Sequence, residues 1–355
     1  MPSIVCLQKS TYDKIDIKSL LAPVNGIKQF VKKGDRVVLK VNLLSASTSD
    51  SAVVTNPSLV KAVALSVSEV GGIPIIADSP SGPFSKRRLE KIYRISGMKQ
   101  LSDEQGIDLN YDTRTTKVEI PHAKRLKKTP ICKYVLDADA IISLPKLKTH
   151  SYMTLTLAIK NMFGVIPGLT KPKYHSLNIK KTAFADMLLD LYSVIPPNLT
   201  IMDGIVGMEG DGPFSGNPID IGMLIASNDA VALDLSICNL IGIEPVGIPV
   251  LRQAKVRKLW PQQIVYPLLN PKDEKIKNFK LPSTVSYVLT GKKIPSKWPV
   301  PSDKCIRCGE CVQICPRRAI SLDNVKARVN YDKCIRCYCC HEVCPEKAID
   351  LSDLK

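Results

Sequence analysis

A chain of 355 residues is long enough for two domains, and 45% hydrophobic residues are enough for a buried core. The formal net charge of +17 excludes an acidic surface overall, and no apolar run approaches the roughly eighteen residues of a membrane span. The first residues lack the basic and then apolar layout of a signal peptide, so we expect a cytoplasmic protein without a membrane anchor.

The first 260 or so residues alternate strand-like and helix-like runs, which predicts an α/β domain with a mixed, largely parallel sheet. Strands are expected at 3–7, 36–41, 73–77, 107–110, 118–120, 140–144, 199–202 and 219–226. Helices are expected at 18–32 (interrupted near Pro23), 57–70, 86–95, 183–194, 229–240 and 250–259. Asn56 and Asn228 are the expected caps of the second and fifth of these helices, because asparagine accepts from free N–H groups of the first turn.

A long loop is predicted at 146–180, and it contains six lysines and two histidines: Lys146, Lys148, His150, Lys160, Lys171, Lys173, His175 and Lys180. Ammonium groups bind carboxylates and phosphates, and a histidine moves protons near neutral pH. We therefore expect His150, Lys160 and His175 to bind and protonate an anion. Lys146, Lys148 and Asn161 are the expected binding residues beside them. The alternative is a solvent-facing basic loop with one histidine satisfied by packing.

A second candidate site follows the strand at 199–202, where Asp203 to Gly216 contains five glycines and three carboxylates. Ligands of α/β proteins bind beyond the carboxyl ends of the strands, and Asp78 ends another strand of this kind. We expect Asp203, Glu209 or Asp211 to bind a cation or move a proton, and Asp78 to join the same crevice. Gly210 and Gly212 would let the backbone approach a bound group there. The alternative is a tight connecting loop, and neither a dinucleotide-binding nor a Walker A motif is present.

The strongest signal lies in the last fifty residues, where the spacing C-x2-C-x2-C-x3-C-P occurs twice. This spacing holds [4Fe-4S] clusters in bacterial ferredoxins, and the fourth cysteine of each run binds the other cluster. The first cluster is therefore assigned to Cys305, Cys308, Cys311 and Cys344, and the second to Cys334, Cys337, Cys340 and Cys315. Cys339 is an additional thiol, either a neighbour of the cluster or a substitute for Cys340.

Two other uses of the cysteines are disfavoured. Structural zinc uses four ligands per ion and does not explain two such runs. Disulfides need an oxidising compartment, whereas the sequence suggests a reducing cytoplasm, as in an anaerobe. The domain boundaries predicted from these patterns are 1–265 for the α/β domain, 266–301 for a Pro- and Lys-rich linker or strap, and 302–355 for the two-cluster ferredoxin domain.

The chain resembles domain-of-unknown-function family 362 over about residues 1–260. The resemblance rests on Asn56–Pro57, Asp78–Pro80, Leu144–His150, Leu157–Gly164 and Asp203–Pro213. It implies an iron–sulfur protein of anaerobes or archaea with an attached ferredoxin domain, and it implies no reaction.

A weaker similarity connects His150, Lys160, Pro167–Gly168 and His175 with nickel-pincer lactate racemases. That similarity implies a lysine that anchors a cofactor, with one histidine as nickel ligand and another as proton carrier. The glycine-rich lead into that lysine is replaced here by Thr154–Ile159. Asp78–Pro80 stands where the family has an earlier catalytic histidine, which puts pincer binding in doubt.

The sequence thus predicts an iron–sulfur oxidoreductase that relays single electrons through two [4Fe-4S] clusters to an anionic substrate or cofactor in the α/β domain. The expected partner is an acidic electron-transfer protein, since the positive charge comes without any nucleic-acid-binding motif. One alternative is a non-catalytic ferredoxin-like carrier or assembly subunit that docks an acidic partner. Another is a non-redox enzyme in which the clusters are structural or sensing elements.

Overall fold

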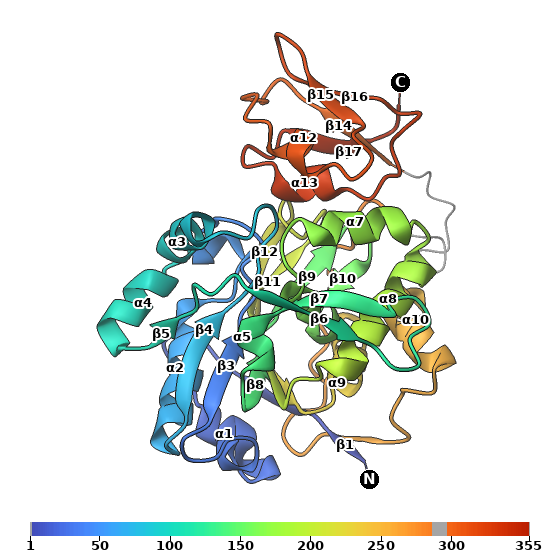
Figure 1. The fold of residues 1–355 in the computed structure, drawn as a ribbon. Helices are drawn as coiled ribbons and strands as arrows, with labels where there is room; N and C mark the ends of the chain where they lie inside the picture. Colours follow the sequence, from blue (N-terminus) through green and yellow to red (C-terminus); the bar gives the residue numbers. More distant parts are fainter. Residues whose placement is uncertain (1, 286–296, 355) are drawn as a thin grey trace.

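A computed structural model describes residues 2–285 and 297–354, and the central part of the expected linker, 286–296, lies outside the described residues. The larger domain is built on a nine-stranded sheet with the order β10-β9-β11-β8-β3-β4-β5 (Figure 1). Strands β8 and β9 follow one another along one edge of β11, and β12 runs antiparallel along its other edge and pairs with β2. The pairs β3–β4, β3–β8, β4–β5, β8–β11 and β9–β11 are parallel, so the sheet is mixed and largely parallel.

The strands of the larger domain are β1 (Ser3–Ile4), β2 (Cys6–Lys9), β3 (Arg36–Lys40), β4 (Ile73–Ala77), β5 (Asp108–Leu109), β6 (Thr115–Glu119), β7 (Lys128–Cys132), β8 (Ala140–Ser143), β9 (Lys146–His150), β10 (Thr154–Thr156), β11 (Leu199–Glu209), β12 (Asn217–Ser227) and β13 (Ile264–Val265). Its helices are α1 (Ile17–Leu21), α2 (Pro57–Glu69), α3 (Lys86–Ile95), α4 (Met98–Gln105), α5 (Lys133–Leu136), α6 (Ala158–Asn161), α7 (Thr170–Leu177), α8 (Lys181–Val194), α9 (Ala230–Ile241) and α10 (Pro249–Val256). Short 3-10 turns are η1 (Ala22–Val24), η2 (Ile27–Gln29), η3 (Ser49–Ser51), η4 (Met162–Val165) and η5 (Pro245–Gly247).

Each face of the sheet has its own apolar core, because side chains alternate between faces along a strand. On β3, Val37 and Leu39 join the core covered by α2, whereas Val38 joins the core covered by α8 and α9. Both cores consist mainly of buried aliphatic side chains with some aromatic ones, and helices cover both faces of the sheet (Figure 1).

Several local predictions differ from the structure. The helix expected at 18–32 is only α1 followed by the turns η1 and η2. The segment 146–180, expected as a loop, contains β9, β10, α6, η4 and α7. The glycine-rich stretch continues β11 to Glu209. Glycine is needed at 204 and 207, because a Cβ on either residue would meet β12 side chains or backbone. Helix α9 is capped by Asp229 instead of Asn228, and its carboxylate accepts from the backbone N–H groups of Val231 and Ala232.

The C-terminal domain contains β14 (Trp298–Pro301), α12 (Glu310–Ile314), β15 (Ile320–Leu322), β16 (Ala327–Val329), α13 (Cys339–Val343) and β17 (Ile349–Ser352). Two short antiparallel pairs, β14–β17 and β15–β16, enclose the two helices. The domain sits above the end of the sheet near β9 and α7, with α13 toward the larger domain (Figure 1).

Candidate functional site

A pocket lies between the two domains, at the carboxyl ends of the parallel strands β3 and β4. Lys40 ends β3, and Asp78 to Ser81 follow β4 directly, so both segments reach the pocket wall. The rest of the wall comes from β9, β10, α6, η4 and α7 and, from the C-terminal domain, α12 and α13. The lining residues from the larger domain are Lys40, Asn42, Leu44, Asp78, Ser79, Pro80, Ser81, Lys148, Thr156, Lys160, Asn161, Phe163, Gly164, Lys171, Pro172, His175 and Pro213. Those from the C-terminal domain are Ile314, Cys339, Glu342 and Val343.

A buried ion pair forms the floor of this pocket. The Lys40 ammonium lies 2.8 Å from an Asp78 carboxylate oxygen, and both side chains are almost fully buried. Lys40 also donates to the carbonyl of Val41 and to Asn161 Oδ1. Gly164 packs directly on the pair, since a Cβ there would lie 2.6 Å from Lys40 Nζ. The other pocket lysines have no carboxylate in salt-bridge contact among the described residues.

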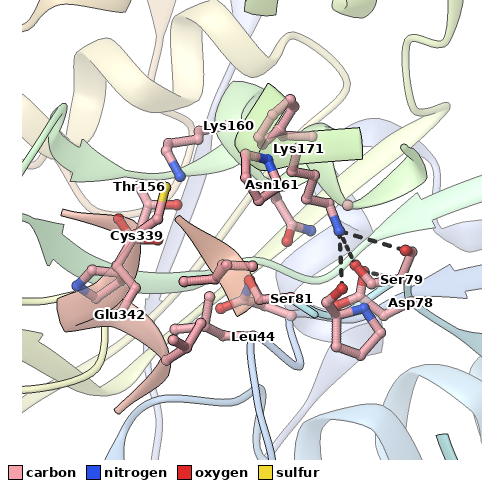
Figure 2. A pocket seen from close by; sticks show the side chains of 18 of the residues that line it. Leu44, Asp78, Ser79, Ser81, Thr156, Lys160, Asn161, Lys171, Cys339 and Glu342 are labelled. Atoms are coloured by element: carbon pink, nitrogen blue, oxygen red, sulfur yellow. Dashed lines mark hydrogen bonds between the residues drawn. The ribbon is translucent and has the colours of Figure 1, made fainter. Parts of the chain in front are cut away.

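Two further lysines are held by backbone carbonyls. Lys171 donates to the carbonyls of Ser79 and Pro80 (Figure 2), and burial lowers its pKa to about 8 although Asp78 opposes the shift. Lys148 is 1% exposed and donates to the carbonyl of Val53. Burial lowers the Lys148 pKa well below its usual value, and the neighbouring charges of Lys160 and Lys146 add to the effect.

Lys160 is the pocket lysine most available to a ligand. No hydrogen bond or ion pair holds its ammonium among residues 2–285 and 297–354. Figure 2 shows it beside Thr156 and Cys339, away from Lys171 and Ser79. Burial lowers the Lys160 pKa, and the nearby Glu342 and Cys339 oppose that shift. A half-buried ammonium without a protein partner among the described residues favours binding of an anion.

The two histidines lie beside this ammonium. His175 stacks on Phe184 at 4.2 Å between ring centres, and burial with the Lys160 charge lowers its pKa to about 3. Burial lowers the pKa of His150 well below its usual range, and the positive charge of Lys160 lowers it further. Both imidazoles are therefore neutral at physiological pH. In the described part of the chain, His150 Nε2 and His175 Nδ1 are buried without a hydrogen-bond partner.

The C-terminal domain contributes one carboxylate to this basic pocket. A Glu342 oxygen lies 3.4 Å from His150 Nε2, and burial raises the Glu342 pKa to about 7 against the effect of Lys160 and Lys148. A second contact joins the domains where His341 Nε2 lies 3.1 Å from the carbonyl of Asp211. On the other side of the interface, Arg88 of α3 lies 3.5 Å from Glu310 of α12.

The structure brings part of the predicted site together and places the rest elsewhere. Asp78, Lys148, Lys160, Asn161 and His175 line the pocket, and His150 lies behind Glu342.

The predicted residues Asp203 and Lys146 form their own fully buried pair at 2.9 Å, which Tyr12 joins through its hydroxyl. Asp203 also accepts from the backbone N–H of Asn56, so its oxygens are occupied.

The glycine-rich end of β11 binds protein groups. Glu209 accepts from the backbone N–H of Lys280, and the N–H of Gly210 donates to the carbonyl of the same residue. The Gly212 carbonyl accepts from Ser151. Glu209, Gly210 and Gly212 therefore fix neighbouring segments of chain and lie outside the pocket lining.

The eight motif cysteines surround two cavities in the C-terminal domain. One cavity is lined by Cys305, Cys308, Cys311 and Cys344, and the other by Cys315, Cys334, Cys337 and Cys340. Each cavity thus receives three thiols from one run and one from the other. Cys339 lines both the second cavity and the basic pocket, so these two spaces share a wall.

The donors around these cavities fit cubane clusters better than single ions. Backbone N–H groups of Ala319 and Ala348 each donate to a thiol, Cys315 Sγ and Cys344 Sγ respectively, at 3.2 Å. Such bonds stabilise charged cluster thiolates. Within the described ranges, no three His, Cys, Asp or Glu side chains converge closely enough to share one metal ion, as a structural zinc site requires.

Sequence reasoning missed the wall supplied by the C-terminal domain. Ile314, Glu342 and Val343 belong to no recognisable ligand motif, and they meet the pocket only through contact between distant parts of the chain. Cys339 was the one sequence feature that could have pointed to this wall, because the cluster motif does not require a cysteine at that position.

Comparison with known proteins agrees with this two-part organisation. Residues 37–239 match the family described as "Domain of unknown function (DUF362)", and residues 285–349 match a 4Fe-4S dicluster domain. The first match spans more than half of the chain. The chain belongs to the DUF362 family. The dicluster match makes it an iron–sulfur protein with a ferredoxin-type domain, which points to electron transfer.

A relative of this DUF362 protein is the thylakoid-associated protein sll1697 of Synechocystis. The two are 34% identical over 291 residues, covering 80% of this chain and 88% of the relative. In the part of the chain that the structure describes, no helix has the length and apolar character needed to cross a membrane.

Two solved structures are distantly similar to this chain. The lactate racemase apoprotein of Thermoanaerobacterium thermosaccharolyticum has 12% identity and a TM-score of 0.39, covering 68% of this chain and 56% of that one. A structural-genomics protein from Thermotoga maritima has 12% identity and a TM-score of 0.35, covering 62% and 56%. The chain spans just over half the length of both. The first agrees with the weaker resemblance seen in the sequence, and at these scores neither carries a functional argument.

Proposed function

We propose that this protein accepts single electrons from an external carrier and transfers them to an anionic molecule bound in the basic pocket. The observation that carries the proposal is the shared wall: Cys339 lines both the second cysteine cavity and the pocket. A redox centre and a ligand site that share a side chain are suited to electron exchange.

The [4Fe-4S] clusters supply one-electron chemistry when bound. Cys305, Cys308, Cys311 and Cys344 would hold one cluster, and Cys315, Cys334, Cys337 and Cys340 the other. The remaining contribution of the chain is to bind, orient and protonate the ligand.

Lys160 is proposed as the principal anion-binding residue, since its ammonium has no protein partner in the described ranges. Lys148 retains N–H donors beyond its one bond to Val53 and would assist. The lowered pKa of the Lys160 ammonium makes it a better proton donor than an exposed lysine. Neutral His150 and His175 would then accept or pass on protons through Nε2 and Nδ1, the ring atoms that lack partners.

The test compares Lys160→Met with Lys173→Met, an exposed lysine two residues beyond Lys171. Each protein is purified without oxygen, and its iron, sulfide, other metals and released small molecules are measured. The proposal expects about eight irons in both and a co-purifying anion that the Lys160 variant loses. An equal anion content in both variants, or an empty pocket in the unmodified protein, would contradict it.

The alternative of a carrier or assembly subunit has its own support in a basic groove on α3. Arg87, Arg88, Lys91, Arg94 and Lys99 line this groove together with Tyr111. Such a surface suits an acidic protein. Eight irons with an empty pocket would favour this function over the first.

A further inference from the structure

The same six residues, Asp-Lys-Cys-Ile-Arg-Cys, occur at 303–308 and at 332–337. The local backbone repeats as well. Arg307 and Arg336 both have a positive φ, at 58° and 54°, and a short helix follows each copy as α12 or α13. The two copies therefore differ only in their surroundings, and each provides an internal reference for the other.

The second copy is partly covered by protein, from Cys334 to Cys337. Arg336 stacks on the Trp298 ring at 4.5 Å, and Cys337 and Ile335 are only partly exposed. Tyr152 of the larger domain lies near Cys337 and Cys339. Burial raises the Tyr152 pKa, and these two thiols raise it further. The cavity of this copy is the one that shares its wall with the pocket.

The first copy faces solvent. Cys308 is the one exposed cysteine among the twelve, and Ile306 beside it is 62% exposed. Leu322 and Val325, in and after β15, are 38% and 66% exposed, and Leu322 lines the same cavity as Ile306. Large aliphatic side chains exposed beside a redox cavity are typical of a contact surface.

Charge identifies the kind of partner. Lys304, Arg307 and Lys347 are exposed around this cavity, and no carboxylate pairs with them in the described ranges. Lys326 and Arg328 are neutralised by Asp303 and Asp323, which leaves Glu346 as the opposing charge in the lining. The surface is thus apolar at its centre and positive at its rim.

We infer that an acidic one-electron carrier protein docks on this surface, here named the docking face and defined by Lys304, Ile306, Arg307, Cys308, Leu322 and Val325. Electrons then arrive at the first cysteine cavity and leave for the pocket from the second. The inference rests on the proposed function, because it assigns a binding surface to the external electron carrier which that function requires. Transient redox complexes bury little area and depend on charge steering, which suits a face with a positive rim.

The test measures the second-order rate of reduction of the full-length iron–sulfur protein by stopped-flow absorbance. The donor is a reduced acidic plant-type ferredoxin, and reduced methyl viologen serves as a small-molecule donor. Lys304→Glu is compared with Lys333→Glu, the same exposed lysine of the other copy, and Ile306→Asp tests the apolar centre.

We expect the unmodified rate with ferredoxin to fall as salt increases. Lys304→Glu and Ile306→Asp should lower the rate at low salt about tenfold, while Lys333→Glu changes it by less than about twofold. Reduction by methyl viologen should be similar in all four proteins, which shows that the variants keep their clusters. Equal loss in Lys304→Glu and Lys333→Glu, an unmodified rate independent of salt, or a rate limited by self-association would overturn the inference.

The two proposals can fail separately. If the docking-face variants behave like the unmodified protein while Lys160→Met still loses its anion, the docking face is wrong and the proposed function remains. If the pocket is empty and the docking-face variants are slow, the electron donor binds as inferred and the pocket ligand is wrong.

Discussion

Five lysines lie in or near the interior of the larger domain, and each has a different relation to its surroundings. Lys40 and Lys146 pair with Asp78 and Asp203, whereas Lys148 and Lys171 donate to backbone carbonyls. Lys160 alone has no such partner in the described ranges. Buried charges lower stability unless they are compensated. Lys148, Lys160 and Lys171 line one cavity with lowered pKa values, which is the pattern expected if the pocket binds an anion as proposed.

Lys171 should leave a signature in the pH dependence of stability. Its pKa falls from 10.5 to about 8 on folding, so between these values the unfolded chain binds more protons than the folded one. The free energy of unfolding should therefore rise with pH across this window, by roughly 3 kcal/mol from this residue alone.

Denaturant unfolding of the iron-loaded protein between pH 7 and 10 measures this rise. Lys171→Met should reduce this rise in the free energy of unfolding, whatever its effect on stability at neutral pH. The rise should not vanish, because Lys148 and Lys160 titrate in both proteins. An unchanged slope would mean that Lys171 is not desolvated in the folded state.

Gly164 should be intolerant of any side chain. A Cβ there would enter the Lys40–Asp78 pair and displace one of its charges. Gly164→Ala should lower the free energy of unfolding by about 1–3 kcal/mol, the usual cost of overpacking, and more if the pair separates. Thermal unfolding under nitrogen tests this, with the exposed β6 substitution Thr116→Ala as the comparison. Equal stability of the two variants would show that the ion pair can move aside.

At the level of secondary structure, the start of α9 gives a paired prediction. Asp229 accepts from two backbone N–H groups of the first turn and from the Ser3 hydroxyl, whereas Asn228 is exposed. Asp229→Ala should lower the free energy of unfolding by about 1–2 kcal/mol, and Asn228→Ala should leave it nearly unchanged. Urea titrations of the two variants decide the matter. The reverse order of effects would restore the cap expected from the sequence.

Elements with local signals were predictable from sequence, and the segments that tertiary contacts shape were not. Helix α2 begins after Asn56, as the Asn–Pro pair predicts, and β3, β4 and β8 are nearly continuous apolar runs. By contrast, α6 is a single turn whose first N–H groups are held by the distant carboxylate of Asp234. A stabilising group so remote in sequence leaves no local pattern.

For the whole molecule, the two domains should respond differently to loss of iron. The C-terminal domain has only small apolar clusters, and cysteines make up much of them. A domain of this size needs its metal centres to fold, because it buries too little apolar surface alone. The larger domain has two extensive cores and no such dependence.

Hydrogen exchange before and after chelation of iron tests this difference. Amide protection should vanish in β15, β16 and β17 and persist in β3, β4 and β8. Persistent protection in the C-terminal strands would mean that the polypeptide holds this domain together without metal.

The four cysteines around each cavity were predictable, because the spacing of the motif is local in sequence and does not depend on how the rest of the chain folds. Of the residues expected at the site, Asp78, Lys148, Lys160, Asn161 and His175 line the basic pocket. Its second wall depends on how two domains meet, and Glu342 reaches His150 across almost two hundred residues of chain. Likewise Asp203 was expected in the pocket, but Tyr12 and Asn56 occupy its oxygens. No periodicity or composition encodes such pairings.

The position of α12 and α13 in the chain has a consequence for how the protein matures. Domains generally fold as units, N-terminal first, during synthesis, so the larger domain can form while the last residues are still being made. Until Ile314, Cys339, Glu342 and Val343 arrive, and iron is delivered to the domain that carries them, the basic crevice stands open on one side. A molecule that has not received its iron therefore lacks the second wall of the pocket, so under the proposed function it would bind its anion only after the clusters are in place.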